Sequence, residues 1–263
     1  MIDAILLAGA PNDGQLKEVS PALSEAMIEI AGRPMIDYVI EALRQSEYIG
    51  RIAVVAPPDV GEFLARDSSR QDAEFVAAGD NMLENILRGI NYLSDERKVL
   101  IVTSDIPLLT TKAVDDFIRR CEAKSQDADL YYPIVAKHIN EAAYPGVQRT
   151  YVRLREGTFT GGNLALVTPK VLEQGRFVLE QTFALRKKPF QLARLFGFKF
   201  IFKLIFRRLS VSEVEEGAFR ILGFRGTAVE SPYPEIGFDV DKPSDLALVQ
   251  EIMEKRMAAK GGG

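Results

Sequence analysis

Short apolar runs alternate with amphipathic stretches of helical length through the first half of the chain. The apolar runs have the length and aliphatic content of buried strands. They cover residues 2–8, 51–56, 73–77, 99–103 and 130–136. The amphipathic stretches cover residues 34–46, 59–65, 82–94 and 110–124. Because strand and helix alternate over short links, we predict a three-layer α/β sandwich with a mostly parallel, Rossmann-like central sheet.

After about residue 140 this rhythm changes. Further strand patterns cover residues 150–155, 163–168 and 226–230. Residues 171–222 are mainly helical in pattern, and a last helix begins near Pro243. One hydrophobic core can serve a chain of 263 residues. We therefore expect a single domain, residues 1–263, with 171–222 as a helical insertion and 259–263 as a disordered tail.

Composition favours an ordinary globular protein, with 47% apolar and 27% charged residues. The single cysteine, Cys121, cannot form an intramolecular disulfide and suits a reducing compartment. The first apolar run lacks the basic flank and cleavage pattern of a signal peptide. No apolar stretch approaches the ~20 residues that a membrane-spanning helix needs. We predict a cytoplasmic location.

One basic segment interrupts an otherwise acidic chain. Residues 181–212 carry eight Lys and Arg and no Asp or Glu, so the net charge of −4 leaves −12 for the remainder. Seven of the 15 phenylalanines lie between Phe183 and Phe206, which gives a basic amphipathic pattern typical of membrane-surface helices. Four interpretations stay open: a helical cap packed on the sheet, peripheral membrane or lipid-linked contact through residues 183–209, a homo-oligomer contact, or a lid over an apolar acceptor. The acidic remainder argues against nucleic acid as a partner.

A glycine-containing turn follows the first predicted strand. In LLAGAPNDG the chain passes through Ala8, Gly9 and Ala10, and Gly14 follows. Such a turn lets backbone N–H groups approach a phosphate closely. The Gly-Lys-Ser/Thr ending of a Walker A loop is missing. An ordinary tight turn explains the same residues, so both interpretations stay open.

Carboxylates occur at two further points. Asp105 in TSDIPLL directly follows the predicted strand 99–103, where it could bind Mg²⁺ or cap the next helix. Asp239 and Asp241 in GFDVDKPSDL alternate along an extended segment and so share one face. Their mutual repulsion favours a bound cation. Asp245, in the first turn of the last helix, is better explained by the helix dipole.

The order LLAG, AGRPMIDYVIEAL, TSDIPLL, TGGN and FDVDKPSDL resembles the MobA-like nucleotidyltransferases of the GT-A-type fold. The resemblance covers about residues 2–168 and 226–256. It implies a Mg²⁺-dependent attack by an acceptor phosphate on the α-phosphate of a nucleoside triphosphate, with release of pyrophosphate. Carried over by position, it assigns nucleotide contacts to Ala8, Gly9, Ala10, Gly79, Asn85 and Asp105. It implies Asp105 as a metal ligand with Asp239 or Asp241 as the second, and places Asn163 of TGGN beside the acceptor.

The phosphate loop departs from the family pattern. The family carries an Arg in this loop and, later, a Lys before the segment that here reads AMIEIAGRP; these cations hold the triphosphate. Here the loop has no Arg and Glu25 stands at the Lys position. Lys17 is the nearby cation that could substitute, so we take it with Asp105 as a candidate catalytic residue. These two departures leave open whether the protein catalyses the family reaction.

The acceptor side is predicted in residues 137–153, where Lys137, His138, Tyr144, Arg149 and Arg153 cluster. An Arg side chain can hold a phosphate through two parallel hydrogen bonds, so we expect Arg149 and Arg153, with Asn163, to bind the acceptor. His138, the single histidine, is more simply an exposed loop residue, because phosphoryl displacement depends on positioning and charge neutralisation.

Two other functions stay open. A GT-A glycosyltransferase would use a nucleotide sugar on a similar scaffold, although its Asp-x-Asp motif would lie in mid-chain and not at Asp239–Asp241. A nucleotide-binding regulatory protein that has lost catalysis is suggested by Glu25.

Overall fold

The computed structural model describes residues 1–66, 72–93, 97–124, 128–174, 203, 206 and 208–261. These residues form one central sheet with the strand order β5-β4-β1-β6-β10-β7-β9-β8, and β11 lies along the second edge of β7. The strands are β1 (Ile2–Leu7), β4 (Ile49–Ala56), β5 (Ala73–Ala77), β6 (Val99–Thr103), β7 (Leu130–Ala136), β8 (Val152–Arg153), β9 (Thr158–Gly161), β10 (Leu164–Val167) and β11 (Gly226–Ser231). A separate hairpin pairs β2 (Glu29–Ile30) with β3 (Arg33–Pro34).

The sheet is mixed but mostly parallel. Strands β5, β4, β1 and β6 pair in parallel, as do β7 and β11. Among the described strands of this sheet, only β9 and β10 run against the common direction. The carboxyl ends of β1, β5 and β6 therefore meet at one edge, the place where open α/β sheets bind ligands.

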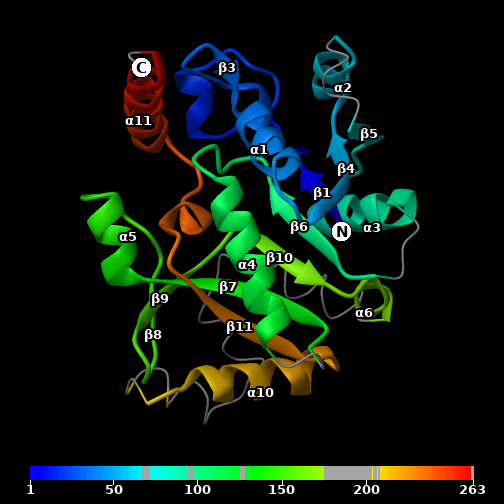
Figure 1. The fold of residues 1–263 in the computed structure, drawn as a ribbon, viewed down its shortest axis with the longest axis vertical. Helices are drawn as coiled ribbons and strands as arrows, with labels where there is room; N and C mark the ends of the chain where they lie inside the picture. The colour runs from blue at the N-terminus through cyan, green and yellow to red at the C-terminus, as the bar shows by residue number, and fades with distance from the viewer. Residues whose placement is uncertain are drawn as a thin grey trace.

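Helices cover both faces of the sheet (Figure 1). Their bounds are α1 (Met35–Arg44), α2 (Pro58–Ala65), α3 (Met82–Leu93), α4 (Thr111–Ala123), α5 (Lys137–Ala143), α6 (Pro169–Gln174), α10 (Val211–Leu222) and α11 (Pro243–Gly261). Leu6 of β1 faces a core shared with α1, α2 and α4, whereas Ile5 and Leu7 face a core shared with α3 and α6. This alternation is the period of two expected of a strand buried on both faces. The predicted three-layer α/β fold is confirmed.

A third apolar cluster joins the two ends of the chain. α11 packs against the β2–β3 hairpin, as Figure 1 shows at its upper left, through side chains that include Ile30, Val249 and Met253. The Ala31 N–H also donates to Gln250 Oε1 at 2.8 Å. This contact brings the segment before α11 back to the edge of the sheet where β1 and β6 end.

The sequence prediction missed several short elements, among them β9 and α5. Strand β9 is short and ends in glycines, and α5 begins directly where β7 ends, so neither has a pattern long enough to stand out. The strand expected at 150–155 is reduced to β8, because the Leu154 N–H turns back to the Gly157 carbonyl at 2.8 Å. His138 accordingly lies in the first turn of α5 and not in a loop.

The predicted insertion 171–222 is described only at its ends. It starts in α6 and closes with α10, where Ser210 and Glu213 cap the helix reciprocally and Gly223 ends it at φ +78°. The Lys203 ammonium pairs with Glu213. The rest of the basic, Phe-rich segment lies outside the described residues, except positions 206 and 208–210.

At the C-terminus, the expected tail begins at residue 259, whereas α11 continues to Gly261. Residues 262 and 263 lie outside the described part of the chain. No helix among the described residues is both long enough and apolar enough to cross a bilayer.

Candidate active site

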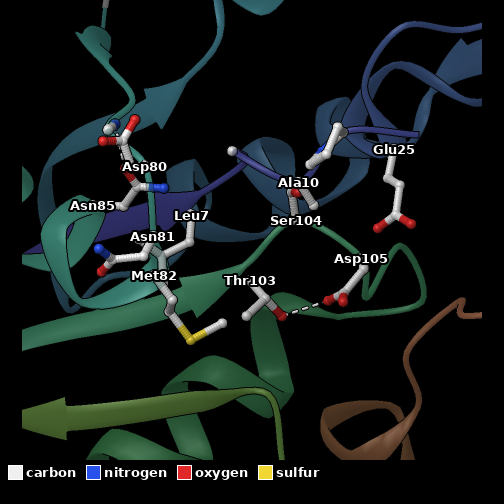
Figure 2. A pocket seen from close by; sticks show the side chains of 13 residues that line it. Leu7, Ala10, Glu25, Asp80, Asn81, Met82, Asn85, Thr103, Ser104 and Asp105 are labelled. Carbon is white, nitrogen blue, oxygen red and sulfur yellow. Dashed lines mark hydrogen bonds between the residues drawn. The ribbon is translucent and has the colours of Figure 1, made fainter. Parts of the chain in front are cut away.

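A cavity of about 290 Å³ opens at the carboxyl edge of β1, β5 and β6. It is lined by Leu7, residues 9–11, Glu25, residues 79–82, Asn85 and residues 103–105. In Figure 2 the segment from Asp80 to Asn85 forms one side of this cavity, and Glu25 and Asp105 lie on the other. The glycine turn and TSDIPLL, separate in the sequence, thus share one site.

Asn85 ties the turn after β1 to the turn after β5. Its Oδ1 accepts a hydrogen bond from the Gly79 N–H at 2.6 Å, and only 6% of the residue is exposed. A Cβ at Gly9 would lie 2.6 Å from Asn85 Nδ2, so Gly9 leaves room for this side chain. Gly79 likewise has no room for a side chain, because a Cβ there would lie 2.3 Å from Glu84. A side chain at either glycine would therefore displace the end of Asn85 or Glu84 and disturb the hydrogen bonds that these side chains accept.

The turn between β5 and α3 is held by its own hydrogen bonds. Asn81 Oδ1 accepts from the Glu84 N–H at 3.0 Å, and Glu84 Oε2 accepts from the Asp80 N–H at 2.9 Å. Arg88 pairs with Glu84 at 2.7 Å and donates to the carbonyls of residues 77 and 78. Arg88 therefore supports the turn from outside the cavity, and the side chains of Asp80 and Asn81 line it.

The loop after β1 is fixed against residues 20–25. The Glu25 N–H donates to the Ala10 carbonyl at 3.1 Å, and Pro11 bridges to Ser24. The buried Asn12 donates to the carbonyls of residues 20 and 22. Ala8, expected to contact the nucleotide, is buried and uses its N–H on the Val55 carbonyl, whereas Gly9 and Ala10 line the cavity.

The cavity lining is acidic. Glu25, Asp80 and Asp105 contribute carboxylates, and no Lys, Arg or His occurs among the described residues that line it. Lys17 lies exposed in the short helix η1 (Gln15–Glu18) and is not part of this lining. Glu25 therefore gives this side of the cavity a negative charge at the position where the resemblance implies a lysine.

Three carboxylates gather next to the cavity. Oxygens of Asp105, Asp239 and Asp241 all lie within 4.8 Å of one another. The backbone sets this arrangement, because the Val240 N–H donates to the Asp105 carbonyl at 2.9 Å. Asp245, in the first turn of α11, accepts a hydrogen bond from the Asp241 N–H at 3.3 Å. Asp245 therefore supports the turn that carries Asp241.

Burial dominates the electrostatics of this cluster. Burial raises the pKa of Asp105, and the nearby charge of Asp241 raises it further. The hydrogen bond from Thr103 Oγ1 to Asp105 Oδ1 (2.5 Å) acts in the opposite direction and lowers this pKa. Burial raises the pKa of Asp239 to about 7, against the attraction of Arg149. Three oxygen donors that repel one another so closely are a set that fits a hard divalent cation such as Mg²⁺.

The predicted acceptor residues are placed differently from one another. Arg149 is buried and pairs with the Asp239 carboxylate. Arg153 lies exposed on β8. Asn163 lies between Thr103 and Ile236: its carbonyl accepts from the Thr103 N–H at 3.1 Å, and its side chain donates to the Ile236 carbonyl at 3.3 Å. Lys137 pairs with Glu141 at 3.4 Å.

Sequence reasoning missed Thr103, Asp80 and Asn81 as site residues, and it missed the pairing of Arg149 with Asp239. Thr103 stands two positions before Asp105, so its proximity offered a signal. The Arg149–Asp239 pair offered none, because 90 residues separate the partners. Asp80 and Asn81 lie next to Gly79, and only the fold shows that their side chains face the cavity.

A glycine turn and an acidic cluster at the carboxyl edge of such a sheet agree with the arrangement that the resemblance to nucleotidyltransferases implies. A family model for the MobA-like NTP transferase domain matches residues 23–168. The chain belongs to this family.

Two 2-C-methyl-D-erythritol 4-phosphate cytidylyltransferases illustrate the relatives. The one from Streptomyces coelicolor is 27% identical, over 95% of this chain and 86% of that protein. The one from Halalkalibacterium halodurans is 25% identical, over 47% of this chain and only 56% of that protein.

Solved structures agree on the fold. A hypothetical transferase from Thermus thermophilus superimposes with a TM-score of 0.79 at 38% identity, over 93% of this chain and 99% of that one. A CMP:2-keto-3-deoxy-manno-octonic acid synthetase complexed with CTP gives a TM-score of 0.61 at 13% identity, over 97% of this chain and 100% of that one, which supports the fold alone.

Proposed function

We propose that this protein is a Mg²⁺-dependent nucleotidyltransferase that transfers a nucleoside monophosphate from an NTP to a phosphorylated small-molecule acceptor. The observation that carries the proposal is the position of Asp105, which both lines the cavity and belongs to the cluster with Asp239 and Asp241. In the reaction an acceptor phosphate oxygen bonds to the α-phosphorus. The bond from the α-phosphorus to its bridging oxygen breaks, and pyrophosphate leaves with that electron pair.

The chain's own residues would bind and orient. All five of these residues line the cavity: Gly9, Ala10, Gly79, Asp80 and Asn85. In this proposal Gly9 and Ala10 border the phosphates, and the turn after β5 together with the start of α3 borders the base and ribose. Thr103 holds the Asp105 carboxylate through its hydroxyl. When bound at the acidic cluster, Mg²⁺ supplies positive charge to the phosphate oxygens.

CTP is the nucleotide to test first. Two cytidylyltransferases are 23% and 27% identical to this chain, and one structural neighbour is complexed with CTP. By the same reasoning the acceptor would be a phosphorylated polyol, with Arg149, Arg153 and Asn163 as the predicted acceptor residues and Lys17 as a predicted catalytic residue.

The test measures pyrophosphate release with each NTP, Mg²⁺ and a panel of phosphorylated polyols and sugars, next to nucleotide binding by thermal shift. Release that requires Mg²⁺, one NTP and one acceptor class is expected. Mg²⁺-dependent binding without pyrophosphate from any acceptor would favour the regulatory protein. Turnover of a nucleotide sugar would favour the glycosyltransferase, and absence of nucleotide binding would refute all three.

Contact with a membrane through residues 183–209 remains a separate proposal. It rests on the eight cations interleaved with phenylalanines in this part of the sequence. Co-sedimentation with vesicles that contain anionic lipid should decrease as salt increases. If salt has no effect, or if the protein stays in the supernatant, this proposal is wrong, and size-exclusion chromatography would then test the homo-oligomer alternative.

A further inference from the structure

Arg149 is held unusually firmly for a residue expected to bind a substrate. Its Nη1 pairs with the Asp239 carboxylate and its Nη2 donates to the Asp239 carbonyl. The guanidinium carbon lies 4.5 Å from the centre of the Phe238 ring, which itself packs against Tyr144 at 4.5 Å. Only 9% of the Arg149 side chain is exposed. These contacts fix the Arg149 side chain beside the acidic cluster.

The charges of the cluster show what this contact does. Asp105, Asp239 and Asp241 together carry −3 when ionised, and Arg149 contributes +1. The guanidinium is bonded to Asp239 alone of the three. Thr103 donates a hydrogen bond to Asp105. Among the described residues, neither Asp105 nor Asp241 forms an ion pair with a Lys or Arg side chain. The charge left for a divalent ion therefore belongs to Asp105 and Asp241.

We propose that Arg149 is a built-in counter-cation and positioning residue: it occupies Oδ1 of Asp239 and offsets the charge of that carboxylate, which disfavours Asp239 as a ligand and leaves the metal to Asp105 and Asp241. This inference rests on the proposed function and assigns a task to a residue that the sequence placed at the acceptor. Two carboxylates neutralise a divalent ion and leave its other coordination positions to water and phosphate oxygens. A third carboxylate would bind the ion more tightly and compete with the triphosphate for it.

An arginine suits this position better than a lysine. Its planar fork reaches a carboxylate oxygen and a carbonyl of the same residue at once, and its flat face stacks on the Phe238 ring. A lysine would keep the charge but lose the two-point grip. Asp239 would then be neutralised but less firmly oriented.

The test measures binding of Mn²⁺ alone, in the absence of nucleotide, from the electron paramagnetic resonance signal of the free ion. Arg149→Met should bind Mn²⁺ more tightly than the unsubstituted protein, on the order of tenfold, because a positive charge is removed and Asp239 is released. Its kcat for pyrophosphate release should fall. Arg149→Lys should return the Mn²⁺ affinity to that of the unsubstituted protein and should recover part of the lost kcat. A merely structural contribution of Arg149 predicts the opposite sign, weaker Mn²⁺ binding in Arg149→Met, and that result would overturn the inference.

A second comparison decides the matter even if Arg149→Met does not fold. Asp239→Asn should keep Mn²⁺ affinity within about tenfold, whereas Asp241→Asn should lose on the order of a hundredfold, because only the latter removes a ligand. Equal losses would contradict the proposal. If the unsubstituted protein binds no Mn²⁺, the proposed function itself fails; if it binds Mn²⁺ and releases pyrophosphate but the variants do not differ, this inference fails alone.

Discussion

The two sides of the cavity place their charges in different ways. On the Asp105 side, three carboxylates lie within 4.8 Å of one another and Arg149 pairs with one of them. On the side of the loop after β1, the family pattern calls for cations, yet Glu25 lines the cavity and Lys17 does not. One side therefore gathers carboxylates that fit a cation, and the other lacks, among its described lining residues, the positive side chains that the resemblance implies.

The positive charge that a triphosphate needs must therefore come from outside the described lining of the cavity. A triphosphate placed among Glu25, Asp80 and Asp105 would be repelled unless metal ions accompany it. Among the described lining residues nothing else offers positive charge, although the basic segment 181–212 is mostly outside the described part of the chain. We therefore expect nucleotide binding to depend on metal far more than in relatives with a Lys or Arg in the loop.

Asp105→Asn should have the largest effect. The variant loses a carboxylate of the metal site at the point where cluster and cavity meet, so turnover should fall about a thousandfold or more. Pyrophosphate release at saturating Mg²⁺ measures this. Asp116→Asn, which changes a buried carboxylate paired with Arg119 and Arg120 on α4, is the control and should keep turnover. Turnover by Asp105→Asn at the normal rate would mean that this carboxylate binds no metal.

Glu25→Lys should reverse the character of the loop side. Replacing a negative charge at the cavity by a positive one should tighten NTP binding about thirtyfold and reduce its dependence on Mg²⁺. Titration calorimetry with and without Mg²⁺ measures both. Glu25→Gln, which only removes the charge, should give an intermediate gain. Weaker nucleotide binding in both variants would show that the Glu25 carboxylate assists the ligand instead of repelling it.

Gly9→Ala should weaken nucleotide binding about tenfold. The added Cβ would lie 2.6 Å from Asn85 Nδ2, so the Asn85 side chain must move and its hydrogen bond with Gly79 is lost. The double variant Gly9→Ala/Asn85→Ala removes the clash, so its loss should be smaller than the sum of the two single losses. Strict additivity would mean that the two turns act independently.

Thr103→Val should have the smallest effect, about fivefold in kcat, because it removes one hydrogen bond to a charged group and leaves the carboxylate in place. Thr103→Ser keeps a hydroxyl and should behave like the unsubstituted protein. If Ser and Val variants are equally impaired, packing of the Thr103 methyl group and not its hydroxyl supports Asp105.

The sequence predicted the positions of the strands and helices more accurately than the side-chain contacts of the site. Helical and strand periodicities located β1, β5, β6 and β7 almost to the residue, because buried parallel strands are read directly from apolar runs. The place of Asp105 and Gly9 at one edge follows from the same topology. The Arg149–Asp239 pair depends on the packing of α11 and Phe238 against distant segments, which no local pattern encodes. Whether Lys17 substitutes for a family cation was equally a question of side-chain position.

The most direct test of the central claim is a calorimetric titration of CTP into the unsubstituted protein, first with Mg²⁺ and then with EDTA. We expect binding with Mg²⁺ and a loss of at least about a hundredfold in affinity without it, because the described lining of the cavity offers carboxylates where phosphates would lie. Equal affinity in the two titrations would contradict the account, since the protein itself would then supply the positive charge that we assign to the metal.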